Sequence, residues 1–348
     1  MGQAFDAERL ELRGQAFLVE GGVGRSSLGY GPFSVSGAGT LAYAGALSTP
    51  GRLTWFDRGG TPSESAGSLG DYTDFRLSPD ETRLAASIAD PKTGFIDIWI
   101  TDLTRHSSAP FTFGPAVNAS PVWSPDGARI IFRTTRSGGV TEFYAKSAGG
   151  GGIEEPVVAQ TVTRLGVLSL AMTLWDWSPD GRYLLFSTTT SSASDLWLVP
   201  LAADPKPASF LTAPGDQWHG NFSPDSKLVA YSSNESGRFE VHVQSFPLTD
   251  RQWTVSTTGG YEPRWRADGR EMYYLSSDQK LMAVGVGPGP SFGAPTELFQ
   301  VRVAGGASQN RTHYVPSRDG RRFLINTPTG DPAMVPITVV LNWTAALK

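Results

Sequence analysis

Trp123-Ser124-Pro125-Asp126-Gly127 is the stretch that decides the fold, and the same five residues recur at 177–181. Other variants of the phrase, some of them degenerate, lie at residues 35–39, 77–81, 222–226, 265–269 and 317–320. Successive copies are separated by about 42 to 54 residues along the 348-residue chain. A period of this length indicates one supersecondary unit copied many times, so the repeat governs the fold as a whole.

The chemistry of the phrase predicts a tight turn between two antiparallel strands. Proline presets φ for the second turn position, Asp suits the third, and Gly tolerates the left-handed backbone that follows. In the unit around Trp123, apolar or alternating segments that we expect to be strands lie at 121–123, 128–133, 142–146 and 155–159. Four antiparallel strands repeated at this spacing are typical of a β-propeller blade.

We therefore predict an all-β chain that forms a β-propeller of four-stranded antiparallel blades. Seven blades are favoured, and six blades with a tail are the alternative. We expect the strand at 15–20 to pair with the C-terminal blade, near 337–341, because this pairing would close the ring without an open edge. The predicted boundaries of this single domain, 1–348, are 1–30 for the closing strand, 31–70, 71–116, 117–171, 172–216, 217–259 and 260–309 for the blades, and 310–348 for the closing blade.

Composition excludes several classes of function. Formal net charge is −4 with charged residues at only 18%, so no basic surface is available for nucleic acid. The chain has no cysteine, which rules out disulfides, thiolate metal sites and a cysteine nucleophile. No run of 18 apolar residues is present to span a membrane. Residues 1–6 align with 281–286, and we therefore expect the chain to begin inside a blade, as a fragment of a longer polypeptide.

The repeat resembles the TolB-like, WD-like (PD-type) propeller repeat of bacteria, on the evidence of the Trp-Ser-Pro-Asp-Gly turn followed by Asp-Leu-Trp-Leu at 195–198. Several stretches are also similar to the C-terminal sensor regions of bacterial Ser/Thr protein kinases. These stretches lie at 53–58, 232–238, 261–265 and 336–343. The resemblance implies a non-catalytic module that binds a protein, a peptide or a small ligand.

Two alternatives remain open: the propeller of a peptidase or hydrolase, and a metal-dependent lyase or lactonase acting at the channel mouth. We expect no cofactor, no bound metal, no nucleic acid and a monomeric chain. If a membrane span precedes the chain, as in the kinases, the propeller would lie in the periplasm, and otherwise in the cytoplasm.

Candidate catalytic patterns have simpler explanations. Residues 289–293 match Gly-x-Ser-x-Gly, but that motif needs a strand before it and a helix after it, whereas a turn is expected here. The four histidines are scattered over different repeats. The repeated aspartates, among them Asp126 and Asp180, are expected to hydrogen-bond the backbone of their own turns.

A binding surface is predicted where aromatic and polar residues precede the first strand of each blade. In a propeller these first strands line the central channel, so such residues converge at one mouth. The alternative is that they only pack blade against blade. The candidate ligand-binding residues are Tyr72, Asp74, Asn118, Trp175, Asp176, Trp218, His219, Tyr261, Glu262 and His313.

Overall fold

The computed structural model contains strands and turns but no α-helix in the residues that it describes. These residues are 2–6, 8–17, 33–44, 50–90, 93–137, 140–158, 171–190, 193–202, 206–304, 311–329 and 337–343. The predicted all-β class is confirmed, and so are the four-stranded antiparallel sheets.

The chain divides into two compact units, whereas the repeats predict one domain over 1–348. The first unit combines Met1–Thr49, Pro91–Gly94 and Gly330–Lys348, and the second combines Pro50–Asp90 and Phe95–Thr329. In the first unit, β1 (Gly2–Asp6) pairs with β2 (Glu11–Phe17). A separate three-stranded sheet there contains β3 (Phe33–Val35), β4 (Leu41–Ala44) and β29 (Ile337–Val340).

The second unit contains six four-stranded blades in its described part, which we number 1 to 6. Blade 1 contains the second half of β6 (Pro62–Leu77), β7 (Arg83–Ala89), β8 (Ile96–Asp102) and β9 (Ser107–Pro110). Blade 2 contains β10 (Asn118–Trp123), β11 (Arg129–Ser137), β12 (Val140–Ser147) and β13 (Glu155–Val158). Blade 3 contains β14 (Ala171–Trp177), β15 (Tyr183–Thr189), β16 (Ser194–Pro200) and β17 (Ala208–Leu211).

The remaining blades follow the same order. Blade 4 contains β18 (Gln217–Phe222), β19 (Leu228–Ser233), β20 (Glu240–Ser245) and β21 (Gln252–Thr254). Blade 5 contains β22 (Tyr261–Trp265), β23 (Glu271–Leu275), β24 (Lys280–Gly287) and β26 (Thr296–Gln300), with the short β25 (Ser291–Phe292) beside β24. Blade 6 contains β27 (Tyr314–Pro316), β28 (Arg322–Pro328), β5 (Gly51–Asp57) and the first half of β6.

The first strands of the blades form the inner ring of the unit. Each contacts the next, in the order β6, β10, β14, β18, β22 and β27, and β27 returns to β6. This is the arrangement of a closed propeller, in which every blade covers the faces of its two neighbours. Large side chains fill the spaces between blades, for example Phe143 of blade 2 against Phe186 of blade 3, with ring centroids 5.4 Å apart.

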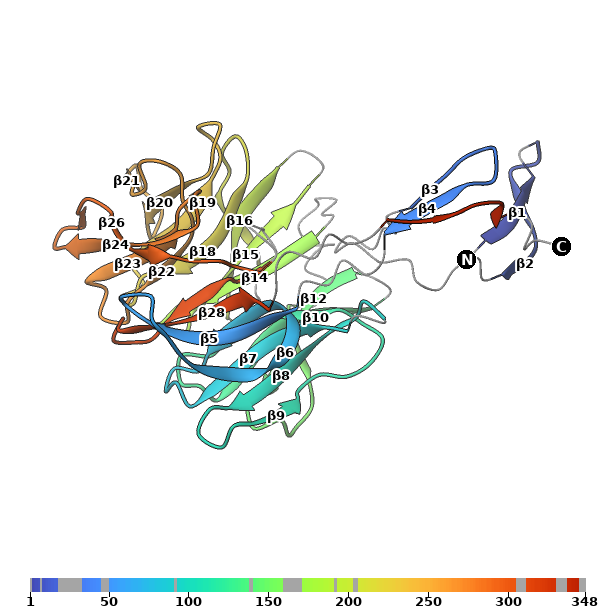
Figure 1. The fold of residues 1–348 in the computed structure, drawn as a ribbon. Coiled ribbons are helices and arrows are strands. Elements are labelled where there is room, and N and C mark those ends of the chain that lie inside the picture. Colours follow the sequence, from blue (N-terminus) through green and yellow to red (C-terminus); the bar gives the residue numbers. More distant parts are fainter. Residues whose placement is uncertain are drawn as a thin grey trace. The chain divides into compact units, whose positions relative to one another are not determined.

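The ring closes differently from the prediction. β28 pairs with β5, from Arg322 opposite Asp57 to Pro328 opposite Gly51, and the two strands lie side by side in red and blue in Figure 1. β2 pairs with β1 and β29 pairs with β4, so the predicted pairing of 15–20 with 337–341 is wrong for the described residues, and 18–20 lie outside them.

The six blades correspond to the alternative count, and the favoured seventh blade is not found among the described residues. Residues 51–70 supply both a third and a fourth strand, whereas β29 supplies only one. Joining β27 and β28 to residues 51–70 therefore completes a four-stranded blade, which leaves no unpaired edge between blades 6 and 1.

The aspartates of the repeated phrase have the predicted turn role. In blade 2, Asp126 Oδ1 accepts hydrogen bonds from Ser124 Oγ at 2.5 Å and from the Ala128 N–H at 3.0 Å. Asp80, Asp180, Asp225 and Asp319 accept the same pair of bonds in their own turns. Each phrase thus holds its hairpin locally, at the face of the ring that we call the turn face.

Candidate functional site

Bulges in the first strands decide which side chains point toward the axis. The register shifts between Tyr72 and Asp74 in β6, and at the corresponding places in β10, β14, β18 and β22. Such a bulge bends the strand and re-aims the side chain beside it. His219 and Glu262 adopt left-handed backbone at these bulges, with φ of 56° and 60°.

The predicted site residues all lie in the second unit, and most of them are buried in the channel. Relative exposure is below 10% for Tyr72, Asp74, Asn118, Trp175, His219, Tyr261, Glu262 and His313. Trp218 and Asp176 are partly buried. Their role as ligand-binding residues stays a prediction.

Four of the predicted aromatic residues form a continuous chain of rings. The Trp175 and His219 rings are 5.0 Å apart, His219 and Tyr261 are 6.5 Å apart, and Tyr261 and His313 are 6.1 Å apart. Trp218 stacks on a neighbouring residue, Phe239, at 4.4 Å. These contacts cross from blade 3 to blade 6, so the rings join the inner strands of four blades.

Asn118 and Tyr72 face other partners. Asn118 donates from Nδ2 to Asp97 Oδ1 at 3.0 Å, and the Tyr72 hydroxyl donates to the Ser68 carbonyl. The structure therefore gathers most of the predicted residues on the axis, whereas Asn118 bonds to blade 1 and Tyr72 bonds to the half of β6 that belongs to blade 6.

Glu262 is the centre of a buried network of charged groups. Its carboxylate accepts hydrogen bonds from the His313 N–H at 2.9 Å and from Arg264 at 3.3 Å, and it contacts His313 Nδ1 at 2.8 Å. Burial alone would raise the pKa of Glu262, but His313, Arg264 and His219 together hold the pKa at about 2. Glu262 is therefore an ionised group held by fixed partners.

A second set of contacts crosses the axis. Arg76 of blade 1 donates to the Trp175 carbonyl of blade 3 at 3.2 Å and to Thr312 Oγ1 at 3.2 Å. Thr312 Oγ1 in turn donates to the Asp74 carboxylate. Arg264 of blade 5 also reaches Thr312, at 3.5 Å. We call this set, with Glu262 and His313, the channel network, because it fills the channel interior with paired charges.

Asp176 lies nearer the turn face than the channel network and joins blade 3 to blade 4. Its Oδ2 accepts hydrogen bonds from Asn221 Nδ2 at 2.9 Å and from the Phe222 N–H at 2.8 Å, and Oδ1 accepts from the Trp177 N–H at 2.9 Å. Burial raises the pKa of Asp176 to about 6, although these hydrogen bonds and the charges of Arg76 and Arg264 act to lower it. The carboxyl therefore titrates just below neutral pH.

A pocket of ≈ 450 Å³ opens above Asp176 at the turn face, and we call it the axial pocket. Its inner level is lined by Arg76, Val122, Asp176 and Asn221. Its outer rim contains Pro79, Pro125, Pro179, Pro224, Ala267 and Arg318. Each inner residue stands two positions before the Ser of a repeated phrase. Each rim residue stands one position after that Ser, or after the residue that replaces it in the phrase at 265–269.

Tryptophans form part of the axial pocket wall. Trp123, Trp177 and Trp265 each donate an indole N–H to a carbonyl, those of Arg76, Gly181 and Asn221, at 3.1, 3.2 and 3.2 Å. Their orientation is thereby fixed. The predicted site did not include most of these residues, because they belong to the repeated phrase and were assigned to folding alone. Their constant offset from Ser was the signal that could have identified them.

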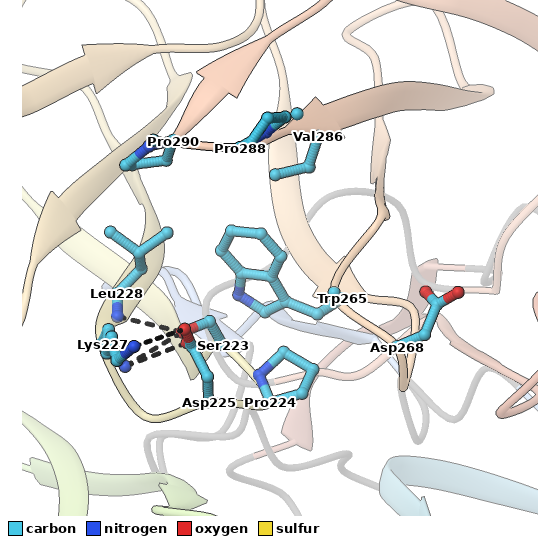
Figure 2. Close-up of a pocket in the computed structure, with 13 residues that line it drawn as sticks. Ser223, Pro224, Asp225, Lys227, Leu228, Trp265, Asp268, Val286, Pro288 and Pro290 are labelled. Carbon is cyan, nitrogen blue, oxygen red and sulfur yellow. Dashed lines mark hydrogen bonds and ion pairs between the residues drawn. The ribbon is translucent and has the colours of Figure 1, made fainter.

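A second cleft, of ≈ 560 Å³, lies between the turn of blade 4 and the loop after β24. Figure 2 shows the Trp265 indole between Pro224 on one side and Pro288 and Val286 on the other, with Lys227 and Asp225 near Ser223. The loop carries the Gly-x-Ser-x-Gly match of residues 289–293. Ser291 begins the short strand β25, and no helix follows it, so the loop expectation agrees with the structure.

The described part of the chain contains no group of three or more His, Asp or Glu side chains placed to hold a metal ion. None of its segments forms a helix that is long and apolar enough to cross a membrane.

Known proteins resemble this chain in fold and, over one stretch, in sequence. No family model matches the chain. A stretch of 128 residues, 36% of this chain, is 27% identical to the "Uncharacterized peptidase YuxL" of Bacillus subtilis, and it spans only 18% of that protein.

Solved structures give broader coverage at lower identity. A putative TolB from Agrobacterium tumefaciens matches with a TM-score of 0.63 and 16% identity, over 81% of this chain and 99% of that one. An oligogalacturonate lyase in complex with manganese matches with a TM-score of 0.55 and 12% identity, over 88% and 95% of the two chains. At these identities the likeness concerns the fold. The chain is thus a β-propeller with the fold of the TolB-like proteins.

Proposed function

We propose that the propeller is a non-catalytic binding module that takes up a peptide segment of a partner protein in the axial pocket. The observation that carries the proposal is the pocket itself, open at the turn face and lined by fixed tryptophans, prolines and a few polar groups. A concave site that combines aromatic and proline side chains with a few polar groups is typical of ligand recognition. We further propose that the module belongs to a larger bacterial signalling protein, such as a Ser/Thr kinase, on the resemblance of its repeats.

The channel network supports binding over catalysis as the role of the axis. Glu262, Arg264 and Arg76 are engaged with one another or with the backbone of facing blades. A general acid or base must reach the substrate and exchange its proton near the working pH. Glu262, whose pKa is held at about 2 by its partners, does not meet this requirement.

A blocked pocket provides the test. Ala267 is the exposed, small member of the rim, so Ala267→Trp fills the pocket mouth without changing the core. Peptides selected from a random displayed library should bind the wild-type chain saturably and quench its tryptophan fluorescence, and Ala267→Trp should abolish both effects.

Ala128→Trp is the matched control, since Ala128 is exposed in the turn of blade 2 and does not line the pocket. Selected peptides that bind both variants as well as the wild type would place recognition elsewhere. A library that yields no binder would refute the proposal.

The peptidase match favours a second candidate, in which the chain is the propeller of a longer peptidase. Only 18% of the B. subtilis protein is covered, so a catalytic domain would lie outside the matched region. Peptide hydrolysis by the full-length protein, retained in a Ser291→Ala variant, would support this candidate. Loss of hydrolysis in that variant would instead assign the reaction to the 289–293 loop.

A further inference from the structure

Charge is unevenly distributed around the axial pocket. Four of its rim positions are proline and one is alanine, and the sixth is Arg318 of blade 6. Arg76, on the inner level, belongs to blade 1, whose inner strand contacts that of blade 6. Two guanidinium groups therefore line the same side of one pocket, at two depths.

Asp176, the one acidic side chain among the described lining residues, is already occupied. Both of its oxygens accept hydrogen bonds from Trp177, Asn221 and Phe222. It therefore has little capacity to receive a cation or an amine from a ligand. The polar groups that can still act on a ligand in this pocket are mainly donors.

Most N–H donors of the Arg318 guanidinium make no hydrogen bond within the described part of the chain. Arg318 is exposed, and its guanidinium makes one hydrogen bond with the described residues, from Nη1 to the Pro79 carbonyl at 2.8 Å. A guanidinium offers five N–H donors in a rigid fork that matches a carboxylate. Its backbone N–H is bonded to Glu81 of the next turn, so the residue is fixed at the rim.

Arg76 is fixed at the inner level by its bonds to Thr312 and Trp175, and 13% of its side chain is still exposed. A ligand that satisfies both levels needs an anionic group at its tip and an apolar body beside the prolines and Val122. Because the rim surrounds the pocket, the end of a chain can enter it more easily than a segment that must turn back.

Resting on the proposed function, we infer that the axial pocket recognises the C-terminal carboxylate of a partner peptide, which Arg318 and Arg76 bind from adjacent blades. The prolines and tryptophans of the wall contact the last side chains of that peptide. Charge-assisted bonds from arginine to a carboxylate are among the strong hydrogen bonds in proteins, and they give directional specificity.

The inference carries its own pH dependence. Ionised Asp176 lines the pocket and repels a ligand carboxylate, while Arg76, which lines the same pocket, attracts it. Arg264, the other cation that acts on Asp176, is bonded to Glu262 in the channel network. Because the pKa of Asp176 is about 6, acidification from neutral pH protonates it before the ligand is protonated. Affinity should therefore rise as the pH falls through 6, and fall again only when the peptide carboxyl titrates.

The experiment compares selected peptides in two forms, one with a free C-terminal carboxylate and one with a C-terminal amide. Binding to the wild-type chain is followed by titration calorimetry and by quenching of tryptophan fluorescence. The free acid should bind, and the amide should bind at least about tenfold more weakly. Equal binding of the two forms would overturn the inference and leave the proposed function standing, whereas binding of neither form would overturn both.

Two variants separate the arginine from general effects on the turn. Arg318→Ala should weaken binding of the free acid about tenfold and leave binding of the amide unchanged. Arg318→Lys should recover part of the loss, because it keeps the charge without the fork. Arg321→Ala is the matched control: Arg321 lies in the same turn, its side chain is 84% exposed, and it does not line the axial pocket. A loss of equal size in Arg321→Ala would contradict the inference.

Discussion

The channel network and the axial pocket are built by the same first strands and the turns that follow them, yet they differ in what their polar groups do. In the channel network, Glu262 contacts Arg264 of its own strand and His313 of blade 6, and Arg76 reaches across to Trp175, so these contacts join blade 5 to blade 6 and blade 1 to blade 3. At the turn face, residues of the repeated phrase form the axial pocket, whose rim carries the exposed Arg318. The residues that looked functional in the sequence lock the ring, and residues of the folding motif form the opening.

The comparison predicts that the largest loss of stability follows a substitution in the channel network. Glu262→Leu should lower the free energy of unfolding by about 3–5 kcal/mol, because it leaves the buried Arg264 without its anion. Urea unfolding followed by circular dichroism measures the loss.

Asp319→Ala is the exposed control in a turn beside the axial pocket. It removes a carboxylate that accepts hydrogen bonds from Ser317 Oγ at 2.7 Å and from the Arg321 N–H at 3.0 Å, and it should cost about 1–2 kcal/mol. Similar losses of stability in the two variants would contradict the division between a channel network that holds the blades together and an open axial pocket.

Acid should selectively weaken the contacts that Glu262 makes in the channel network. Glu262 has a pKa of about 2 in the folded chain and an ordinary value of 4.5. Its contribution is thus fully present above pH 4.5 and is lost as the pH falls from 4.5 toward 2, by about 3 kcal/mol in total. Unfolding free energies of the wild type and Glu262→Gln, measured across this range, should converge on acidification. A difference that does not change with pH would show that the carboxylate is not held ionised.

The local part of this structure could be predicted from the sequence, because its causes lie within a few residues. The turn at Trp123–Gly127 follows from proline, aspartate and glycine chemistry, and its Ser–Asp hydrogen bond confirms it. Ring closure could not be predicted in the same way. β5 and β29 are both apolar third strands by pattern, and only the choice between β28 and β4 as partner, far away in the chain, distinguishes them.

Burial of the candidate site was equally beyond the sequence. Glu262 and His313 are 51 residues apart, and Arg76 and Trp175 are 99 apart, so their contacts depend on the assembled ring. An acid or histidine on a channel strand has the same pattern whether it faces solvent or another blade. The axial pocket was accessible to pattern reasoning, since its residues keep one offset from the repeated Ser.

The smallest effect is expected in the turns that lack glycine. Ser226 and Glu81 occupy the left-handed position with φ of 57° and 58°, which costs a non-glycine residue roughly 1 kcal/mol. That position alone predicts a slightly higher melting temperature for Ser226→Gly. The structure adds an opposing contribution, because Ser226 Oγ accepts a hydrogen bond from the Asp180 N–H of the next turn at 3.2 Å.

These two contributions can be separated with a pair of variants. Ser226→Ala loses the hydrogen bond and keeps the backbone cost, so it should be less stable than the wild type by about 0.5–1.5 kcal/mol. Ser226→Gly loses the same bond but relieves the backbone, so it should lie near the wild type and about 1 kcal/mol above the alanine variant. Thermal unfolding of both measures the difference. Equal melting temperatures for the two would mean that the turn of blade 4 tolerates a side chain at no cost. Neighbouring turns would then be joined by Ser226 without strain.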